Sequence, residues 1–322
     1  MKPISQLIAS ALLLACAAGA ALAQSYPSKP VHMIVPFLAG GGVDALARAL
    51  AQRFTEAWGQ SVIVENRPGA GGNIGANAVA KAAPDGHTLL VASTGLSMAP
   101  SLYRKLPFDP VKDLAAASQI MSNYFVLVAN PGMPASLKEL VALAKSQPGK
   151  LNYGHTGLGG SPHLVGEMLR AATGINIVFV PYKGDAQILF AMLANEVQMT
   201  FAPPATVVQM VKTGKLRALA VTGTTRSTSF PDVPTTTEVG FPEVSYVGWV
   251  GFFAPEGTPR DILNKISLET TRALRMPEIV ERLVSGGLEA AGTTPEEFAA
   301  RYRADVARYA KIIKDADIPL VD

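Results

Sequence analysis

Two glycine-rich turns contain the residues best suited to bind a small anion. Residues 40–42 are consecutive glycines after an apolar run at residues 32–35, and residues 157–160 include three further glycines. Each turn precedes a helical pattern, and the first turn of a helix has backbone N–H groups without internal partners, which attract anions together with the helix dipole. We interpret the two turns as halves of a carboxylate-binding site. For the first turn alone, a tight turn with Asp44 as helix N-cap explains the residues equally well.

The residues around Ser161 invite comparison with a hydrolase motif. The order Gly-Gly-Ser-Pro-His at residues 159–163 does not follow G-x-S-x-G, so we do not expect a serine nucleophile. Pro162 is typical of the first turn of a helix, which would make Ser161 an N-cap. A role for the Ser161 hydroxyl in ligand binding is about as well supported as this N-cap role.

No motif indicates a metal, a cofactor or a nucleic acid. The glycines at residues 69–75 do not fit the dinucleotide fingerprint and follow the wrong turn, and the histidines lack metal-ligand spacing. The formal net charge is +3 without a basic run, which argues against nucleic-acid binding. His155 and Lys183 fall in predicted cleft loops, where each can meet a carboxylate, although a surface histidine and a solvated lysine are the simpler alternatives.

The hydrophobic periodicity predicts two α/β units. Strands and helices alternate through residues 31–92 and again through residues 151–222, as in parallel sheets flanked by helices. Apolar segments at residues 120–129 and 247–254 are expected to cross between two lobes, and three helices after residue 259 are expected to pack on the first sheet. The sequence therefore predicts a two-lobed α/β fold of mostly parallel sheets, with lobe 1 formed by residues 24–124 and 249–322 and lobe 2 by residues 125–248.

The N-terminus has the features of an export signal. Lys2 precedes an apolar stretch at residues 7–22 that ends in Ala-Leu-Ala, so residues 1–23 are predicted to be a signal peptide cleaved after Ala23, and the protein is expected in the periplasm. A lipoprotein anchor at Cys16 is the alternative, but the Ala-Leu-Ala site lies at a better distance from the apolar run. Cys16 is the single cysteine, which excludes an intramolecular disulfide.

Several long motifs resemble the Bug-type solute-binding proteins, the receptor subunits of tripartite tricarboxylate transporters. The similarity extends over essentially the whole mature chain and includes PFLAGGGVDALAR (residues 36–48), VENRPGAGGNIGANAVAKAAPDGHTLL (64–90), GHTGLGGSPHLVGE (154–167), PYKG (181–184), GKLRALAVTG (214–223) and FPEVSYVGWVGFFAPEGTP (241–259). The resemblance implies a type II-like periplasmic binding protein fold, in which two crossing strands form the hinge and a small carboxylate is enclosed between the lobes.

The resemblance also implies a set of ligand contacts at strand ends. In lobe 1 these are Phe37, Gly41, Gly42, Asp44, Ser93, Thr94 and Ser97. In lobe 2 they are His155, Thr156, Gly157, Gly160, Ser161, His163, Tyr182, Lys183, Gly184 and Ala202. Many family members have a hydroxyl residue at the position of His155, and many have an aspartate at the position of Ala202. Because an aspartate there suits a ligand ammonium group, Ala202 favours a plain carboxylate or a more apolar acid.

We therefore expect a non-catalytic periplasmic receptor without a cofactor. It would capture a small carboxylate, such as a dicarboxylate, a tricarboxylate or a related organic acid, and deliver it as a monomer to membrane permease subunits. A sensor that presents its ligand to a signalling partner is an alternative that the sequence does not separate from transport. A hydrolase that uses Ser161 and His163 is disfavoured by the motif spacing.

Overall fold

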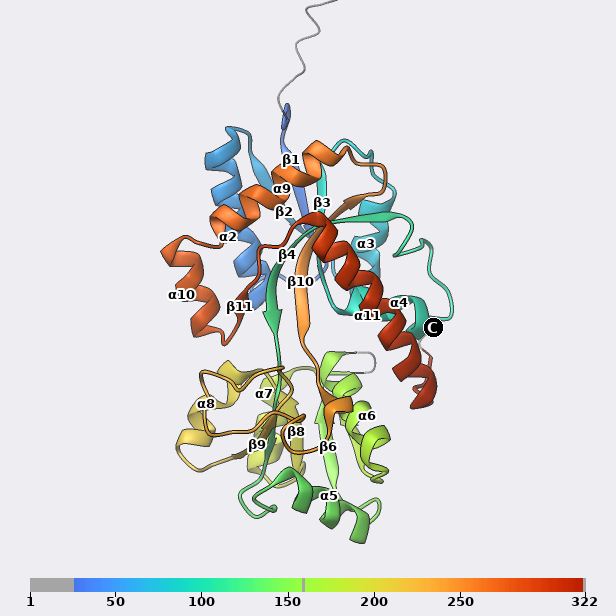
Figure 1. The fold of residues 1–322 in the computed structure, drawn as a ribbon, viewed down its shortest axis with the longest axis vertical. Helices are drawn as coiled ribbons and strands as arrows, with labels where there is room; N and C mark the ends of the chain where they lie inside the picture. The colour runs from blue at the N-terminus through green and yellow to red at the C-terminus, as the bar shows by residue number, and fades with distance from the viewer. Residues whose placement is uncertain (1–25, 158–159, 321–322) are drawn as a thin grey trace, which may run out of the picture.

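The computed structural model describes residues 26–157 and 160–320, which form two lobes connected by crossing strands (Figure 1). The predicted signal peptide and the alternative anchor at Cys16 lie outside these residues. No helix of the described chain is long and apolar enough to cross a membrane.

The first lobe contains a six-stranded sheet in the order β11-β4-β10-β3-β1-β2. Its strands are β1 (Val31–Val35), β2 (Val62–Asn66), β3 (Thr88–Ser93), β4 (Leu114–Asn123), β10 (Gly248–Pro255) and β11 (Glu289–Ala290). Strand β1 pairs in parallel with β2 and β3, whereas β10 is antiparallel to both β3 and β4. Strands β1 and β3 have the apolar, largely buried sequences expected of the sheet centre.

The second lobe contains a five-stranded sheet in the order β7-β6-β8-β5-β9. Its strands are β5 (Val126–Ala129), β6 (Asn152–His155), β7 (Val178–Pro181), β8 (Met199–Ala202) and β9 (Arg217–Val221). Strand β6 is parallel to β7 and β8, and β5 is antiparallel to β8 and β9. The predicted two-lobed α/β fold is confirmed, but both sheets are mixed, because the chain that enters each sheet from the other lobe runs antiparallel to its neighbours.

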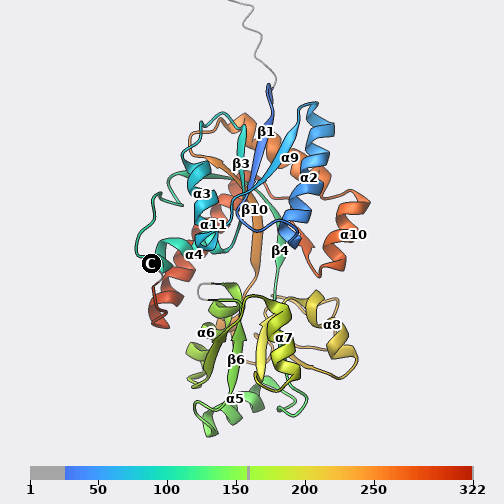
Figure 2. The same cartoon turned by 180° about the vertical axis from the view of Figure 1, so that it is seen from behind.

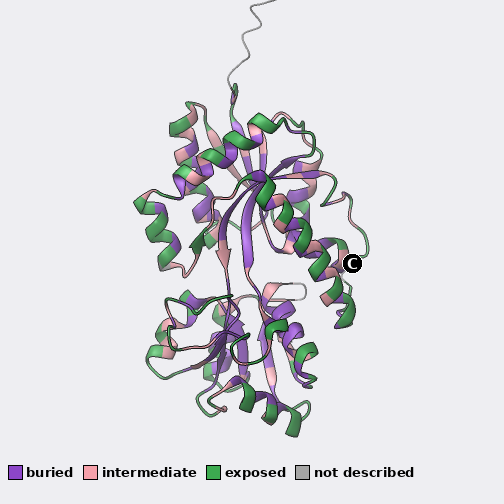
Figure 3. Cartoon of the chain, in the orientation of Figure 1, coloured by how far each residue is buried: buried purple, intermediate pink, exposed green. Residues whose placement is uncertain are grey.

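Helices cover both faces of each sheet (Figure 3). In lobe 1 they are α2 (Gly42–Trp58), α9 (Arg260–Ala273) and α10 (Pro277–Ser285) on one face, and α3 (Asn73–Ala80), α4 (Gly95–Leu102) and α11 (Pro295–Asp315) on the other. In lobe 2 they are α5 (Leu137–Ser146) and α6 (Ser161–Thr173) on one face, and α7 (Asp185–Leu193) and α8 (Pro204–Lys212) on the other. Short 3₁₀ turns are η1 (Ala70–Gly72) and η2 (Pro242–Val244).

The crossing segments differ in two ways from the expectation. The predicted single strand at residues 120–129 is divided into β4 and β5, with Tyr124 and Phe125 between them. The last helix, α11, does not pack on the first sheet alone: Phe298 and Tyr302 belong to a core cluster of lobe 1, whereas Tyr309 and Ile313 belong to a core cluster of lobe 2. Its 21 residues span about 32 Å, which is enough to reach both cores.

The strand membership of the two sheets agrees with the lobe boundaries inferred from the sequence, which remain a prediction. All strands between residues 126 and 221 belong to the five-stranded sheet, and those on either side belong to the six-stranded sheet. Figure 2 shows from behind that β4 and β10 extend between the upper lobe and the lower one, where β4 leaves the upper lobe and the antiparallel β10 returns to it. These two strands therefore hold the lobes next to one another.

Candidate functional site

A cavity of 220 Å³ lies between the lobes beside the crossing strands. Lobe 1 contributes Phe37, Val43, Ser93 and Thr94 to its wall, and lobe 2 contributes Ser161, Pro203 and Pro204. Tyr124, Tyr246 and Trp249 line it from the crossing segments, and Leu288 lines it from the loop before β11. Ligands of two-lobed α/β proteins bind at such an interface, so this cavity is the candidate site.

The starts of several helices converge on this cavity. Helices α2, α4, α6 and α8 follow the carboxyl ends of β1, β3, β6 and β8, and each contributes a residue at or next to its first turn. Within the described residues, no side chain caps any of these four helices. Their first-turn N–H groups are available to an anion, except at Pro162 and Pro204, which lack the hydrogen. The Ser97 and Thr206 amides are also engaged, because they donate to the carbonyls of Thr94 and Pro203.

The N-cap residues of the two glycine turns differ from those considered in the sequence. Gly41 is the N-cap of α2 and Gly160 is the N-cap of α6, so the N-cap roles considered for Asp44 and Ser161 are wrong. Both glycines have extended backbone conformations, with φ of −75° and −70°. Ser161 is instead the first residue of its helix, and it lines the cavity.

Asp44 lies buried behind the first glycine turn, where its carboxylate is fully engaged. It accepts hydrogen bonds from the Gly40 amide at 2.9 Å, from Arg48 Nε at 3.0 Å and from Asn66 Nδ2 at 2.8 Å. The Arg48 guanidinium, together with the Gly40 and Asn66 donors, lowers the pKa of Asp44 to about 2 despite its burial. Asp44 thus stabilises the turn, and direct contact between Asp44 and a ligand remains a prediction.

Thr94 connects the start of α4 to the crossing strand β10. Its Oγ1 accepts a hydrogen bond from the Trp249 amide at 2.7 Å, and its own amide donates to the Trp249 carbonyl at 3.0 Å. Ser97 donates its hydroxyl to the Thr94 carbonyl at 2.6 Å and is completely buried. Ser93 and Thr94 line the cavity, and their contact with a ligand remains a prediction, whereas Ser97 does not line it and supports Thr94 through this bond.

Tyr246 is a cavity residue that was not singled out in the sequence. Its hydroxyl donates to Ser161 Oγ at 2.9 Å, and its ring packs 5.4 Å from that of Phe125. Burial raises the pKa of Tyr246, whereas its hydrogen bonds with Ser161 and Thr94 act to lower it. The starts of α4 and α6, one from each lobe, therefore meet at one hydroxyl group. The only sequence signal for this role is an aromatic residue just before the second crossing segment.

His155 and His163 lie inside lobe 2 and do not line the cavity. Their ring centroids are 4.7 Å apart, and both rings pack against Phe179. His155 is 1% exposed, so the alternative of a surface histidine is wrong. Burial is the main cause that lowers the pKa of both histidines. The pKa of His163 falls to about 4, because the neighbouring His155 and Arg170 add electrostatic repulsion. The predicted contacts of these histidines with a ligand have no support in the geometry of the described residues.

The remaining predicted contacts are not part of the cavity wall. Gly41 and Gly42 are exposed at the start of α2, and Thr156, Gly157 and Gly160 belong to the loop after β6, of which residues 158–159 are outside the described chain. Tyr182, Lys183 and Gly184 follow β7, with Lys183 exposed, and Ala202 is buried at the end of β8. Of the predicted contacts, Phe37, Ser93, Thr94 and Ser161 are the ones that the structure brings together in one cavity.

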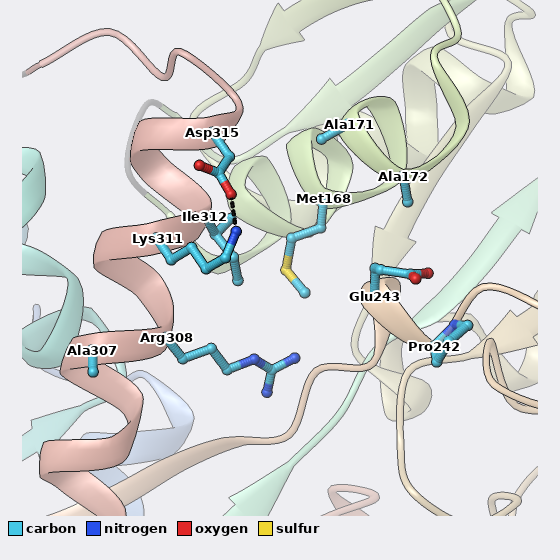
Figure 4. A pocket seen from close by; sticks show the side chains of 10 residues that line it. All are labelled: Met168, Ala171, Ala172, Pro242, Glu243, Ala307, Arg308, Lys311, Ile312 and Asp315. Atoms are coloured by element: carbon cyan, nitrogen blue, oxygen red, sulfur yellow. Dashed lines mark hydrogen bonds and ion pairs between the residues drawn. The ribbon is translucent and has the colours of Figure 1, made fainter.

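A larger groove of 890 Å³ lies outside the cleft, between α6, η2 and α11 (Figure 4). Met168 and Ile312 form its apolar floor, and Lys311 forms an ion pair with Asp315 at its edge. Its described lining includes no helix start at the end of a strand, so it lacks the donor geometry of the interlobe cavity.

Comparison with known proteins identifies the family. The family model described as "Tripartite tricarboxylate transporter family receptor" matches residues 46–318. The chain belongs to this receptor family. It is 40% identical over 293 residues to a UPF0065 protein of Bordetella pertussis, and the match covers 90% of each chain. It is also 34% identical over 301 residues to the protein BugT of the same organism, with 92% of each chain covered.

Solved structures of the family share the fold. The periplasmic binding protein BugD is 34% identical, with a TM-score of 0.77 over 92% of this chain and 100% of BugD. Rpa4515 of R. palustris, solved with adipate, is 32% identical, with a TM-score of 0.79 over 92% of this chain and 100% of Rpa4515. MatC of Rhodopseudomonas palustris, solved with malate, is 30% identical, with a TM-score of 0.76 over 89% of this chain and 100% of MatC. These neighbours are solute-binding proteins, and the receptor family is one of periplasmic binding proteins.

Proposed function

We propose that the protein is a periplasmic receptor that binds a small organic carboxylate in its interlobe cavity and delivers it to the membrane permease of a tripartite tricarboxylate transporter. The observation that carries this proposal is the convergence of uncapped helix starts from both lobes on one cavity, within the described chain. Relatives that were solved with adipate and malate support a carboxylate ligand, such as a dicarboxylate, a tricarboxylate or a related organic acid.

The proposal assigns the ligand contacts to the wall of the cavity. Ser93, Thr94 and Ser161 supply hydroxyl groups, and the first turns of α2, α4 and α6 supply backbone N–H donors. Hydrogen bonds to a charged acceptor contribute about 1.5–3 kcal/mol each, so a few of these donors suffice for micromolar affinity. Export through cleavage after Ala23 and function as a monomer belong to the same proposal.

The experiment that tests this proposal is a binding screen on the mature chain after bound ligands have been removed by reversible unfolding. We expect at least one acid from a panel of mono-, di- and tricarboxylates and acidic amino acids to stabilise the protein against heat. At a ligand concentration of about a hundred times Kd, the gain is about 2.7 kcal/mol. If no acid in the panel changes the melting temperature, the proposal is wrong.

A parallel measurement addresses catalysis. Ester hydrolysis by the purified protein, lost in Ser161→Ala, would favour the hydrolase alternative. We expect none, because Ser161 Oγ accepts a hydrogen bond from Tyr246, and the described residues give it no bond to a histidine.

A further inference from the structure

Three side chains on one face of α11 hold residues 245–249, which lead from lobe 2 into β10. The three are Arg301, Asp305 and Arg308. Their spacing of four and three residues places them on the same side of the helix. Arg301 Nη2 donates to the Val247 carbonyl at 2.6 Å, and Arg308 donates to the Ser245 carbonyl. Both donors are charged, and such hydrogen bonds are stronger than those between neutral groups.

Asp305 lies between the two arginines and connects α11 to the cavity wall. Its Oδ2 accepts a hydrogen bond from Trp249 Nε1 at 2.8 Å and lies 3.7 Å from Arg301 Nε. Burial raises the pKa of Asp305, whereas the bond from Trp249 and the two nearby guanidinium groups act to lower it. Trp249 lines the cavity, and its amide donates to Thr94 Oγ1. The face of α11 is therefore linked through Trp249 to the start of α4.

The same stretch of chain is fixed to lobe 2 by Thr222, which is completely buried. The Tyr246 amide donates to the Thr222 carbonyl, and Thr222 Oγ1 donates to the Tyr246 carbonyl, both at 2.8 Å. The Thr222 amide donates to the Phe125 carbonyl, and Thr222 Oγ1 accepts from the Phe125 amide, both at 2.9 Å. Both crossing segments are therefore tied together at one residue of lobe 2.

This arrangement leaves one residue in each crossing segment for the hinge. In lobe 1, the ladder between β4 and β10 ends at the pair of Asn123 and Gly248. In lobe 2, the bonds of Thr222 fix the next residue but one in each segment. Tyr124 and Val247 lie between the two fixed points, so a rotation of the lobes is concentrated in their backbone angles.

We propose that Arg301, Asp305 and Arg308 form a latch that limits hinge rotation at Val247 and keeps the cavity residues of this chain in position. Rotation at Val247 has to bend or break the bond between its carbonyl and Arg301. Helix α11 also packs into core clusters of both lobes, so it resists their separation. The latch goes beyond the proposed function, because it restrains the protein in the absence of any bound acid.

The test removes both guanidinium groups from the mature chain in the double variant Arg301→Met with Arg308→Met. The accepting carbonyls belong to half-buried residues, so water can replace the lost donors and we expect the variant to fold. Without these bonds to charged groups, the chain opens locally at lower cost. Amide hydrogen exchange at Tyr246 and Trp249 should therefore become at least about tenfold faster. The increase should exceed any increase at Met33, whose amide in the centre of β1 reports general stability.

The matched control is Arg303→Met, which removes the same charge from the same helix. Arg303 is exposed and does not line the cavity. This variant should leave the exchange at Tyr246 and Trp249 unchanged. An equal effect of Arg303→Met and of the double variant would overturn the proposal, as would unchanged exchange in the double variant.

A second measurement tests the restraint on the hinge itself. Spin labels at Val284→Cys on α10 and Gln209→Cys on α8 report the separation of the lobes without added acid. Their distance distribution should be broader in the double variant than in the native chain. Faster exchange with an unaltered distribution would show that the three residues hold only the chain and not the lobes, which also overturns the proposal. If the double variant does not fold, Arg301→Gln alone is measured by the same criteria.

Discussion

At the scale of single residues, the hydroxyl of Tyr246 is the group on which both halves of the site depend. It orients Ser161 of lobe 2 and lies next to Thr94 of lobe 1. Tyr246→Phe keeps the ring packed against Phe125 but removes the donor, so Ser161 becomes free to rotate away. We expect the variant to lose about 1 kcal/mol of ligand-binding free energy, a roughly fivefold rise in Kd by titration calorimetry, with little change in stability.

The control for Tyr246→Phe is the neighbouring tyrosine. Tyr309 lies 6.2 Å from Tyr246 by ring centroids, and its buried hydroxyl has no hydrogen-bond partner among the described residues. Tyr309→Phe should therefore leave Kd unchanged and leave the protein at least as stable as before. Equal losses of affinity in both variants would show that the Tyr246 hydroxyl has no special role.

His163 makes the stability of the protein depend on pH. Its buried ring has a pKa of about 4, below the ordinary value of 6.5, so the unfolded chain takes up the proton more readily than the folded chain. The stability that the neutral His163 ring allows is fully present above about pH 6.5. As the pH falls from there towards 4, the free energy of unfolding decreases by about 3 kcal/mol. The charges nearest to it are Arg170, whose repulsion acts in the same direction, and Glu167, whose Oε1 is 3.7 Å from Nε2.

The measurement is urea unfolding at pH values of about 7, 5.5 and 4.5 for the native chain and for His163→Phe. The phenylalanine ring suits the contacts with Phe179, and the Nδ1 atom that it replaces has no partner among the described residues. We expect the variant to lose less stability than the native chain does over this acid range. Identical pH slopes in the two proteins would show that His163 does not titrate in this window.

At the scale of elements, hydrophobic periodicity predicted most strands and helices because it is a local property. Helix α4 was missed, since Gly95 and Pro100 interrupt its pattern. The path of α11 into lobe 2 was missed for another reason: its partners, such as Tyr246 and Arg170, are distant in the sequence.

The difference between local patterns and contacts between distant residues also explains which site residues were predictable. Phe37 lies two residues after β1, Ser93 is the last residue of β3 and Ser161 opens α6. Chain topology alone places such positions at the cleft. Tyr246 and Leu288 reach the cavity only because the two lobes meet, which no local pattern reveals. Likewise, His155 ends a strand but is enclosed by His163 and Phe179, so its burial depends on tertiary contacts.

The contact between β10 and α11 predicts a severe effect of one added methyl group. A Cβ atom at Gly251 would lie 2.3 Å from Phe298 Cζ and 2.9 Å from the Ser118 carbonyl oxygen. Phe298 is completely buried, so the side chain has little room to move. We expect Gly251→Ala to lower the free energy of unfolding by about 2–3 kcal/mol in urea titrations.

Gly132 provides the matched control for this substitution. A Cβ atom there would have no neighbour within 4 Å among the described residues, and the backbone is not left-handed. Gly132→Ala should therefore change stability by less than about 0.5 kcal/mol. A small effect at both positions would mean that β10 and α11 are able to separate without cost.

At the scale of the whole molecule, the lobes are joined on one side and only touch on the other. The crossing strands and α11 connect them, and Arg170 of α6 donates to the Ala316 carbonyl at 2.6 Å beyond the end of α11. On the side of α10 and α8, one contact is between Gly287 and Pro204: a Cβ on Gly287 would lie 3.0 Å from Pro204 Cβ. We therefore expect a ligand to enter where Gly287 and Pro204 separate, with the opposite side acting as the hinge.

A ligand held by residues of both lobes stabilises the closed arrangement, because part of its contacts exist only there. Spin labels at Val284→Cys on α10 and Gln209→Cys on α8, both exposed, report the separation across this side. We expect a broad distance distribution without ligand and a narrower, shorter one with a saturating concentration of an acid that binds in the screen. A label pair within lobe 1, Val284→Cys with Leu268→Cys, should not respond. If the interlobe distribution is the same with and without bound acid, the lobes do not close on the ligand, and the cavity binds it as a rigid pocket.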